Sequence, residues 1–215
     1  MTSDRHDTMR DIARDLPVVL TVPGLNGSDE RHWQTLWEQQ RDDCVRANLG
    51  HWDDPYREDW IRRLDGAIYG CGENVILVAH SLGCMAVSHW AQAYEQTAAR
   101  QVTAALLVAP CDPERAHVAP PIARFAPVPG ERLPFPSILV ASTNDPFARI
   151  DRSRHFAELW GSTFVEIGMQ GHINSDSDLK AWDYGLELLE ELRQAGTAAS
   201  LDAASHRQTL RYGIG

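Results

Sequence analysis

The amino-acid sequence predicts an α/β fold, in which one parallel β-sheet is covered by helices on both faces. Short runs rich in β-branched residues alternate along the chain with amphipathic stretches, which is typical of parallel strands connected by helices. The 215 residues, of which 43% are apolar and 23% charged, suit one domain with a sizeable core. A single domain therefore accounts for the body of the chain.

Six runs are predicted to be strands and five stretches to be helices. The strands are expected at Val18–Val22, Cys44–Leu49, Asn74–Ala79, Ala104–Ala109, Ser137–Ser142 and Thr163–Ile167. The helices are expected at Glu30–Arg41, Glu58–Tyr69, Leu82–Ala98, Ala148–Trp160 and Leu179–Gln194. Because such crossovers are right-handed, this order predicts six parallel strands in one sheet. The link between Ala109 and Ser137 is too rich in proline for one long helix, and we expect a cap or rim over a site.

Composition divides the chain into a polar leader at residues 1–16, a domain at residues 17–194 and a tail at residues 195–215. The leader has no apolar signal region, and no run reaches the roughly 18 apolar residues of a membrane span. A formal net charge of −10 argues against nucleic acid or an anionic membrane as partner. The four cysteines lack paired spacing, so we expect reduced thiols, inert at Cys84 and Cys111, in a cytoplasmic protein.

The strongest chemical signal is Ala79-His80-Ser81-Leu82-Gly83, where the third predicted strand runs into a helix. This context is typical of a nucleophile elbow, which lifts a serine hydroxyl above the end of the strand. The tight turn requires small residues two positions before and after the serine, and Ala79 and Gly83 meet this requirement. The Leu82 N–H then lies at a helix N-terminus, where it can bind an oxyanion. The alternative is that Ser81 only caps a buried helix.

A serine nucleophile needs a general base, and the base needs a carboxylate that holds its tautomer. In α/β-hydrolases the order along the chain is Ser, Asp, His. Asp145 follows the fifth predicted strand, and His172 lies on a Gly-flanked loop after the sixth. Asp112, after the fourth strand, is a rival acid, but its strand is expected one position further from His172. Asp145 has a second interpretation, as the cap of a helix that begins near Phe147.

Other histidines compete with His172 for the role of base. His51 and His117 are loop candidates, whereas His80 precedes the serine and is expected to point away from it. The remaining five fall in predicted helices, the leader or the tail: His32, His89, His155, His6 and His206.

The second oxyanion donor is expected in the loop after the first strand, at the backbone N–H of Leu25. If the first strand lies beside the third, with the second outside it, the strand order reverses there and a crevice opens between the loops. The N–H of Leu25 can then face that of Leu82. Gly24 allows the close approach, although a plain turn glycine explains it as well.

Two further segments carry weaker signals. Ser28 followed by the predicted helix, with Trp33 and Trp37 four residues apart, indicates a capped helix whose aromatic residues lie in the core. Residues 51–54, with the sequence HWDD, have the residue types of a metal site, but a solvated acidic loop is the better interpretation.

Several segments together resemble a known family: PGLNGSDERHWQTLW, WDDPYREDW, VAHSLGC, LPFPSILVASTNDPF and GHIN. They are similar to the small serine hydrolases related to retinoblastoma-binding protein nine, over about Val18 to Gln194. The resemblance implies a compact α/β-hydrolase without a large cap domain, with esterase-like activity. It also implies that Ser81, Asp145 and His172 match the family's triad. An L-x-C-x-E sequence is absent, so no retinoblastoma-type pocket interaction is carried over.

The sequence as a whole predicts a serine hydrolase that acts on small ester or amide substrates through an acyl-enzyme. It predicts no cofactor and no metal, and a small molecule rather than nucleic acid or membrane as partner. Two alternatives remain: an acyltransferase that uses the same three residues, and a catalytically silent binding protein on a hydrolase fold. Neither the natural substrate nor the oligomeric state follows from the sequence.

Overall fold

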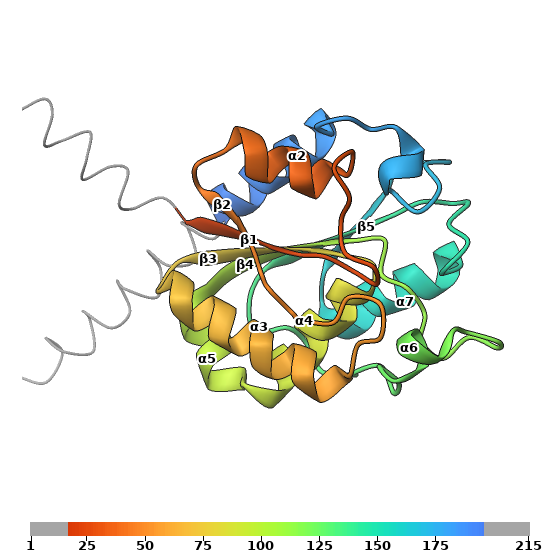
Figure 1. The fold of residues 1–215 in the computed structure, drawn as a ribbon, viewed down its shortest axis with the longest axis horizontal. Helices are drawn as coiled ribbons and strands as arrows, with labels where there is room; N and C mark the ends of the chain where they lie inside the picture. Colours follow the sequence, from red (N-terminus) through yellow and green to blue (C-terminus); the bar gives the residue numbers. More distant parts are fainter. Residues whose placement is uncertain (1–16, 196–215) are drawn as a thin grey trace, which may run out of the picture.

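The computed structural model describes residues 17–195, which form a six-stranded sheet between two layers of helices (Figure 1). The predicted leader, and the predicted tail beyond residue 195, lie outside the described residues. The strands are β1 (Val18–Val22), β2 (Cys44–Arg46), β3 (Val75–His80), β4 (Val102–Val108), β5 (Ser137–Ala141) and β6 (Thr163–Glu166). The helices are α2 (Trp33–Gln40), α3 (Arg57–Cys71), α4 (Leu82–Ala93), α5 (Glu95–Gln101), α6 (Pro120–Ala123), α7 (Ile150–Trp160), a 3-10 turn (Ser175–Ser177) and the last helix (183–195).

The strands run in the order β2-β1-β3-β4-β5-β6, and every neighbouring pair is parallel. The first strand therefore lies beside the third, with the second outside it, which is the condition for a crevice at this point. The strand order reverses between β1 and β3, so the connections after these two strands diverge and leave room at their carboxyl ends. β5 and β6 are also neighbours, as predicted, whereas β4 lies one position further from β6.

Alternate side chains of β3 enter two separate cores, because successive side chains of a strand point to opposite faces. Val75, Leu77 and Ala79 pack with residues of α3, α4 and α7, whereas Ile76 and Val78 pack with residues of α2 and the last helix. Figure 1 shows these layers, with α2 and the last helix above the sheet and α3, α4 and α5 below it. A strand buried on both faces explains the unbroken apolar run in its sequence.

The second strand is shorter than predicted and ends at Arg46 rather than at residue 49. β2 lies at the edge of the sheet and has only β1 as a partner, with Arg46 opposite Thr21. The Ala47 N–H still donates to the Thr21 carbonyl, at 2.9 Å. β1 ends one residue later, at Val22, so β2 has no strand left to pair with.

The first predicted helix also begins later than expected, at Trp33 rather than at Glu30. α2 begins at Trp33, and the Nδ1 of His32 caps it by accepting the Gln34 N–H. Ser28 is therefore not the cap; its hydroxyl donates to the Gln34 side chain at 2.7 Å. Trp33 and Trp37 are at most 1% exposed, which confirms that they lie in the core.

The predicted helix over residues 82–98 is divided into α4 and α5 at Tyr94, whose φ of −125° and ψ of 43° are not helical. The change of direction lets α5 lead into the start of β4. The proline-rich link forms only the short α6 and irregular chain, as its prolines require. No helix within residues 17–195 is long and apolar enough to cross a membrane.

Candidate functional site

Ser81 lies in the turn between β3 and α4 with a φ of 54° and a ψ of −120°. L-residues with a β-carbon rarely adopt this conformation, which costs energy and persists where the surroundings hold it. The Ser81 N–H donates to the Val108 carbonyl of β4 at 2.9 Å. A β-carbon at Gly83 would overlap the carbonyl oxygen of Val22, and one at Gly24 would lie 2.8 Å from the Ser81 β-carbon. The turn is therefore packed directly against the loop that follows β1.

His172 and Asp145 lie beside Ser81 in an unbroken chain of hydrogen bonds. The His172 Nε2 is 2.8 Å from the Ser81 Oγ, and its Nδ1 lies 2.9 and 3.0 Å from the two carboxylate oxygens of Asp145. The His172 and Asp145 side chains are only 8% and 5% exposed. An ionised carboxylate only accepts, so the ring proton belongs on Nδ1 and leaves Nε2 to accept the serine hydroxyl.

Asp145 is held by its own loop as well as by His172. Its Oδ1 accepts the Phe147 N–H at 2.8 Å, which forms a tight turn before α7. The alternative interpretation of Asp145 as a helix cap is wrong, because α7 begins only at Ile150 with Arg149 as its cap residue.

Asp112, the rival acid, has other partners. Its carboxylate accepts the Glu114 N–H at 3.1 Å and pairs with the Arg152 guanidinium at 3.3 Å. The strand order explains the difference, because β4 is not a neighbour of β6. Asp112 therefore lies in an ion pair rather than against the imidazole.

A cavity of about 340 Å³ opens over Ser81 and His172. Its apolar wall contains Leu25, Ile122 and Phe147, so the proline-rich link does form part of the rim, through Ile122 in α6. Its polar lining comes mainly from two loops: Asn26, Gly27, Asp29, Asn174, Ser175 and Asp176. The Phe147 ring lies 4.3 Å from the His172 ring, centre to centre. Phe147 was not predicted from the sequence as a site residue. Its position two residues after Asp145 could have indicated that it lies near the site.

Two further histidines reach this cavity and stay neutral at pH 7. The Nε2 of His80 lies 2.9 Å from the carbonyl oxygen of His172, and because a carbonyl only accepts, His80 donates. Burial lowers the pKa of His80 well below its usual value and that of His32 to about 4. His80 is thus bonded to the backbone of His172 and not to Ser81. Sequence reasoning did not assign it this contact.

The two predicted oxyanion donors come from loops that touch each other. Leu82 is the first residue of α4 and is fully buried, and Leu25 lines the cavity. A β-carbon at Gly24 would lie 3.1 Å from the Leu82 nitrogen. The chain beside Leu25 therefore approaches the elbow as closely as a glycine allows.

The other candidates from the sequence lie elsewhere. His51 and His117 do not line the cavity over Ser81. In the acidic loop at residues 51–54, Asp54 pairs with Arg124. Within residues 17–195, no group of three or more His, Cys, Asp or Glu side chains is arranged to hold a metal ion.

The thiols near the site are buried. Burial raises the pKa of Cys111 to about 12, partly opposed by a hydrogen bond with Ser81, and raises that of Cys84 well above its usual value. A protonated thiol is a weak nucleophile. Both observations fit the prediction that these cysteines are inert.

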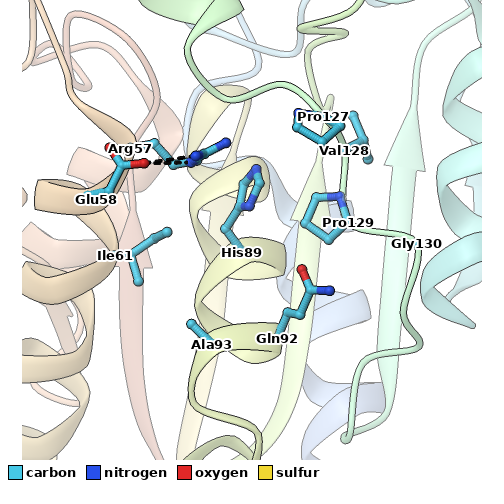
Figure 2. A pocket seen from close by; sticks show the side chains of 10 residues that line it. All are labelled: Arg57, Glu58, Ile61, His89, Gln92, Ala93, Pro127, Val128, Pro129 and Gly130. Carbon is cyan, nitrogen blue, oxygen red and sulfur yellow. Dashed lines mark hydrogen bonds and ion pairs between the residues drawn. The ribbon is translucent and has the colours of Figure 1, made fainter.

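A larger cavity, of about 630 Å³, lies apart from Ser81 between α3, α4 and residues 127–130 (Figure 2). Arg57 and Glu58 form an ion pair at its edge, at 2.8 Å. The His89 Nε2 donates to the Phe125 carbonyl at 2.7 Å, which occupies that nitrogen. The lining offers no serine or cysteine beside a base, so hydrolytic chemistry is better placed at the smaller cavity.

Comparisons with known proteins identify the family and support the fold. A family model described as "Serine hydrolase" matches residues 19–191. A YdeN-like hydrolase from Pectobacterium atrosepticum is 28% identical, with 90% of this chain and 99% of that chain covered at a TM-score of 0.75. The ydeN gene product of Bacillus subtilis is 20% identical, with 81% and 97% covered at a TM-score of 0.63. An esterase from Thermogutta terrifontis is 17% identical, with 84% and 90% covered at 0.59. A search of curated protein sequences found no match.

Proposed function

This chain belongs to the serine hydrolase family, and on that premise we propose that it hydrolyses small carboxylic esters through an acyl-enzyme formed on Ser81. In this proposal His172 is the general base and Asp145 is the acid that orients it. The observation that carries the proposal is the chain of hydrogen bonds from Asp145 through His172 to Ser81, at 2.9 and 2.8 Å, beneath an open cavity.

The reaction has two steps. In the first, the Ser81 Oγ attacks the ester carbonyl while His172 Nε2 takes its proton, and the resulting imidazolium then protonates the departing alcohol. In the second, water attacks the acyl-enzyme, His172 again takes the proton, and the carboxylic acid leaves as Ser81 recovers its hydrogen. Asp145 stabilises the imidazolium in both steps by accepting the Nδ1–H.

The negative charge on the substrate oxygen needs donors that are already in place. We assign this role to the backbone N–H groups of Leu25 and Leu82. Leu82 begins α4, so its N–H has no partner within the helix, and the helix dipole favours an anion there. The close contact of Gly24 with the elbow supports Leu25 as the second donor.

The size of the cavity favours small substrates. Its volume of about 340 Å³ is near the lower end of the roughly 300–1,000 Å³ typical of ligand sites. Leu25, Ile122 and Phe147 supply an apolar surface for a short acyl chain or a small alcohol. We therefore expect acetate and butyrate esters to be hydrolysed with a higher kcat/KM than long-chain esters.

The test is hydrolysis of p-nitrophenyl esters of increasing acyl length by the wild type and by Ser81→Ala. We expect Ser81→Ala to abolish turnover and to change the free energy of unfolding by less than about 1 kcal/mol, because the substitution removes one oxygen at the surface of a cavity. Turnover that survives in Ser81→Ala would refute the assignment of the nucleophile. A higher kcat/KM for decanoate than for butyrate would refute the assignment of the substrate class.

A further inference from the structure

The loop that carries Asp145 and the loop that carries His172 run side by side beyond the ends of β5 and β6. The backbone ladder between the two strands extends into these loops, where the Thr143 N–H donates to the Gly168 carbonyl at 2.8 Å. After that bond, side chains rather than backbone carbonyls accept the next N–H groups.

Two side chains, those of Ser142 and Asn144, bind consecutive N–H groups of the opposite loop. The Ser142 Oγ accepts the Gln170 N–H at 2.9 Å, and the Asn144 Oδ1 accepts the Gly171 N–H at 2.8 Å. The Ser142 hydroxyl also donates to the Asn144 Oδ1, at 2.8 Å. Because a backbone N–H can only donate, the amide atom that faces Gly171 is the oxygen, and the single hydroxyl proton points to it.

These bonds join the two residues before the proposed base to residues that lie one and three positions before the proposed acid. We propose that Ser142 and Asn144 are positioning residues for the reaction. They hold the His172 imidazole within hydrogen-bonding distance of the Asp145 carboxylate. The proposal rests on the proposed function, because it assigns these two residues to the same site. The hydrogen bonds of both residues go to the two loops and not to Ser81, so their effect on the reaction passes through His172 and Asp145.

Burial makes Ser142 the more important of the two. Ser142 is 1% exposed, so water does not compete for its hydroxyl, whereas Asn144 is exposed. Loss of the Ser142 hydroxyl would leave the Gln170 N–H without its partner. On its other side the His172 loop is held by the bond from His80 to the His172 carbonyl and by a 2.8 Å bond from the Trp33 Nε1 to the Ile173 carbonyl, and neither bond reaches Asp145. A shift of about 1 Å in a catalytic group can lower a rate by roughly 100-fold.

The experiment compares Ser142→Ala, Asn144→Ala and a control, Ser137→Ala, with the wild type. Ser137 begins β5 at the end away from the site, is 5% exposed, and shares a 2.7 Å hydrogen bond with the Ser162 hydroxyl. The control therefore removes a buried, bonded hydroxyl from the strand that leads to Ser142. The measurements are kcat and KM for p-nitrophenyl butyrate, the rate of labelling by a fluorophosphonate, and the thermal midpoint.

We expect Ser142→Ala to lower kcat and the labelling rate by roughly 10- to 100-fold with little change in KM. Asn144→Ala should have a smaller effect of the same kind, and Asn144→Asp, which keeps an acceptor oxygen, should restore most of the lost kcat. The control, Ser137→Ala, should keep the wild-type kcat. Its thermal midpoint should fall by as much as that of Ser142→Ala.

The positioning role would be overturned if the wild type is active and Ser142→Ala and Asn144→Ala have the same kcat as the control. The proposed function would then stay intact. If Ser142→Ala does not fold, an unchanged kcat in the exposed Asn144→Ala variant overturns the proposal on its own. A folded wild type that neither hydrolyses the ester nor reacts with the fluorophosphonate would overturn the proposed function, and the positioning role with it.

Discussion

At the scale of single residues, two aspartates illustrate how the same carboxylate takes different roles in different surroundings. Asp145 directs both oxygens at His172 from a side chain that is 5% exposed, whereas Asp112 is paired with Arg152. A neutral histidine needs its proton on Nδ1 to present a free Nε2 to Ser81, and only Asp145 is placed to select that tautomer.

The first prediction at this scale concerns Asp145→Asn and its control, Asp112→Asn. The asparagine amide can donate to Nδ1 and favour the wrong tautomer, so we expect Asp145→Asn to lower kcat by about 10⁴-fold, as in other Ser-His-Asp sites. Asp112→Asn should lower kcat by less than about tenfold, because its contacts are with Arg152 and not with the imidazole. The measurement is kcat for p-nitrophenyl butyrate at pH 7. A larger loss in Asp112→Asn would show that the acid is assigned to the wrong strand.

At the scale of elements, α2 depends on a buried neutral histidine. The Nδ1 of His32 accepts the Gln34 N–H at the start of the helix, and burial lowers the pKa of His32 to about 4. The unfolded chain binds a proton at this residue below about pH 6.5, whereas the folded chain binds it only near pH 4. The stabilisation is therefore complete above pH 6.5 and is lost as the pH falls towards 4.

A second prediction follows for His32→Asn, which keeps an oxygen acceptor at the cap and does not titrate. The difference in unfolding free energy between the wild type and this variant should shrink or reverse in the variant's favour as the pH falls from 6.5 to 4. The change should be of the order of 3 kcal/mol over this range. Urea unfolding at several pH values measures it. A difference that does not vary with pH would show that His32 titrates normally in the folded protein.

The ends of elements were harder to predict than their order, and the reasons lie in tertiary contacts. β2 ends where β1 stops offering it a partner. Nothing in the sequence of residues 44–49 shows where the neighbouring strand ends. The capping of α2 by His32 instead of Ser28 depends on which side chain the fold buries. The parallel direction of the six strands, in contrast, follows from apolar runs and right-handed crossovers, and it was predicted correctly.

At the scale of the whole molecule, the fold brings four segments together at the carboxyl ends of the strands. They are the loop after β1, the turn after β3 and the loops after β5 and β6. The position of Ser81 at a strand-to-helix turn was predictable because strand, turn and helix are all local in the sequence, and strand adjacency predicted that Asp145 and His172 lie beside it. Phe147 and the Ser142–Asn144 pair were not predicted, because their contacts depend on how two loops pack. The assignment to the serine hydrolases is confirmed. The catalytic roles of Ser81, His172 and Asp145, the oxyanion donors, the ester substrate and the narrower relation to retinoblastoma-binding protein nine remain predictions.

The central claim is that Ser81 is a nucleophile activated by His172, and covalent labelling tests it most directly. The folded wild type is treated with a fluorophosphonate at pH 7, and the adduct is located by mass spectrometry of its peptides. We predict one adduct per chain, on Ser81, and no adduct in Ser81→Ala, because an unactivated serine reacts poorly. No adduct on the folded wild type, or an adduct on a residue other than Ser81, would contradict the claim.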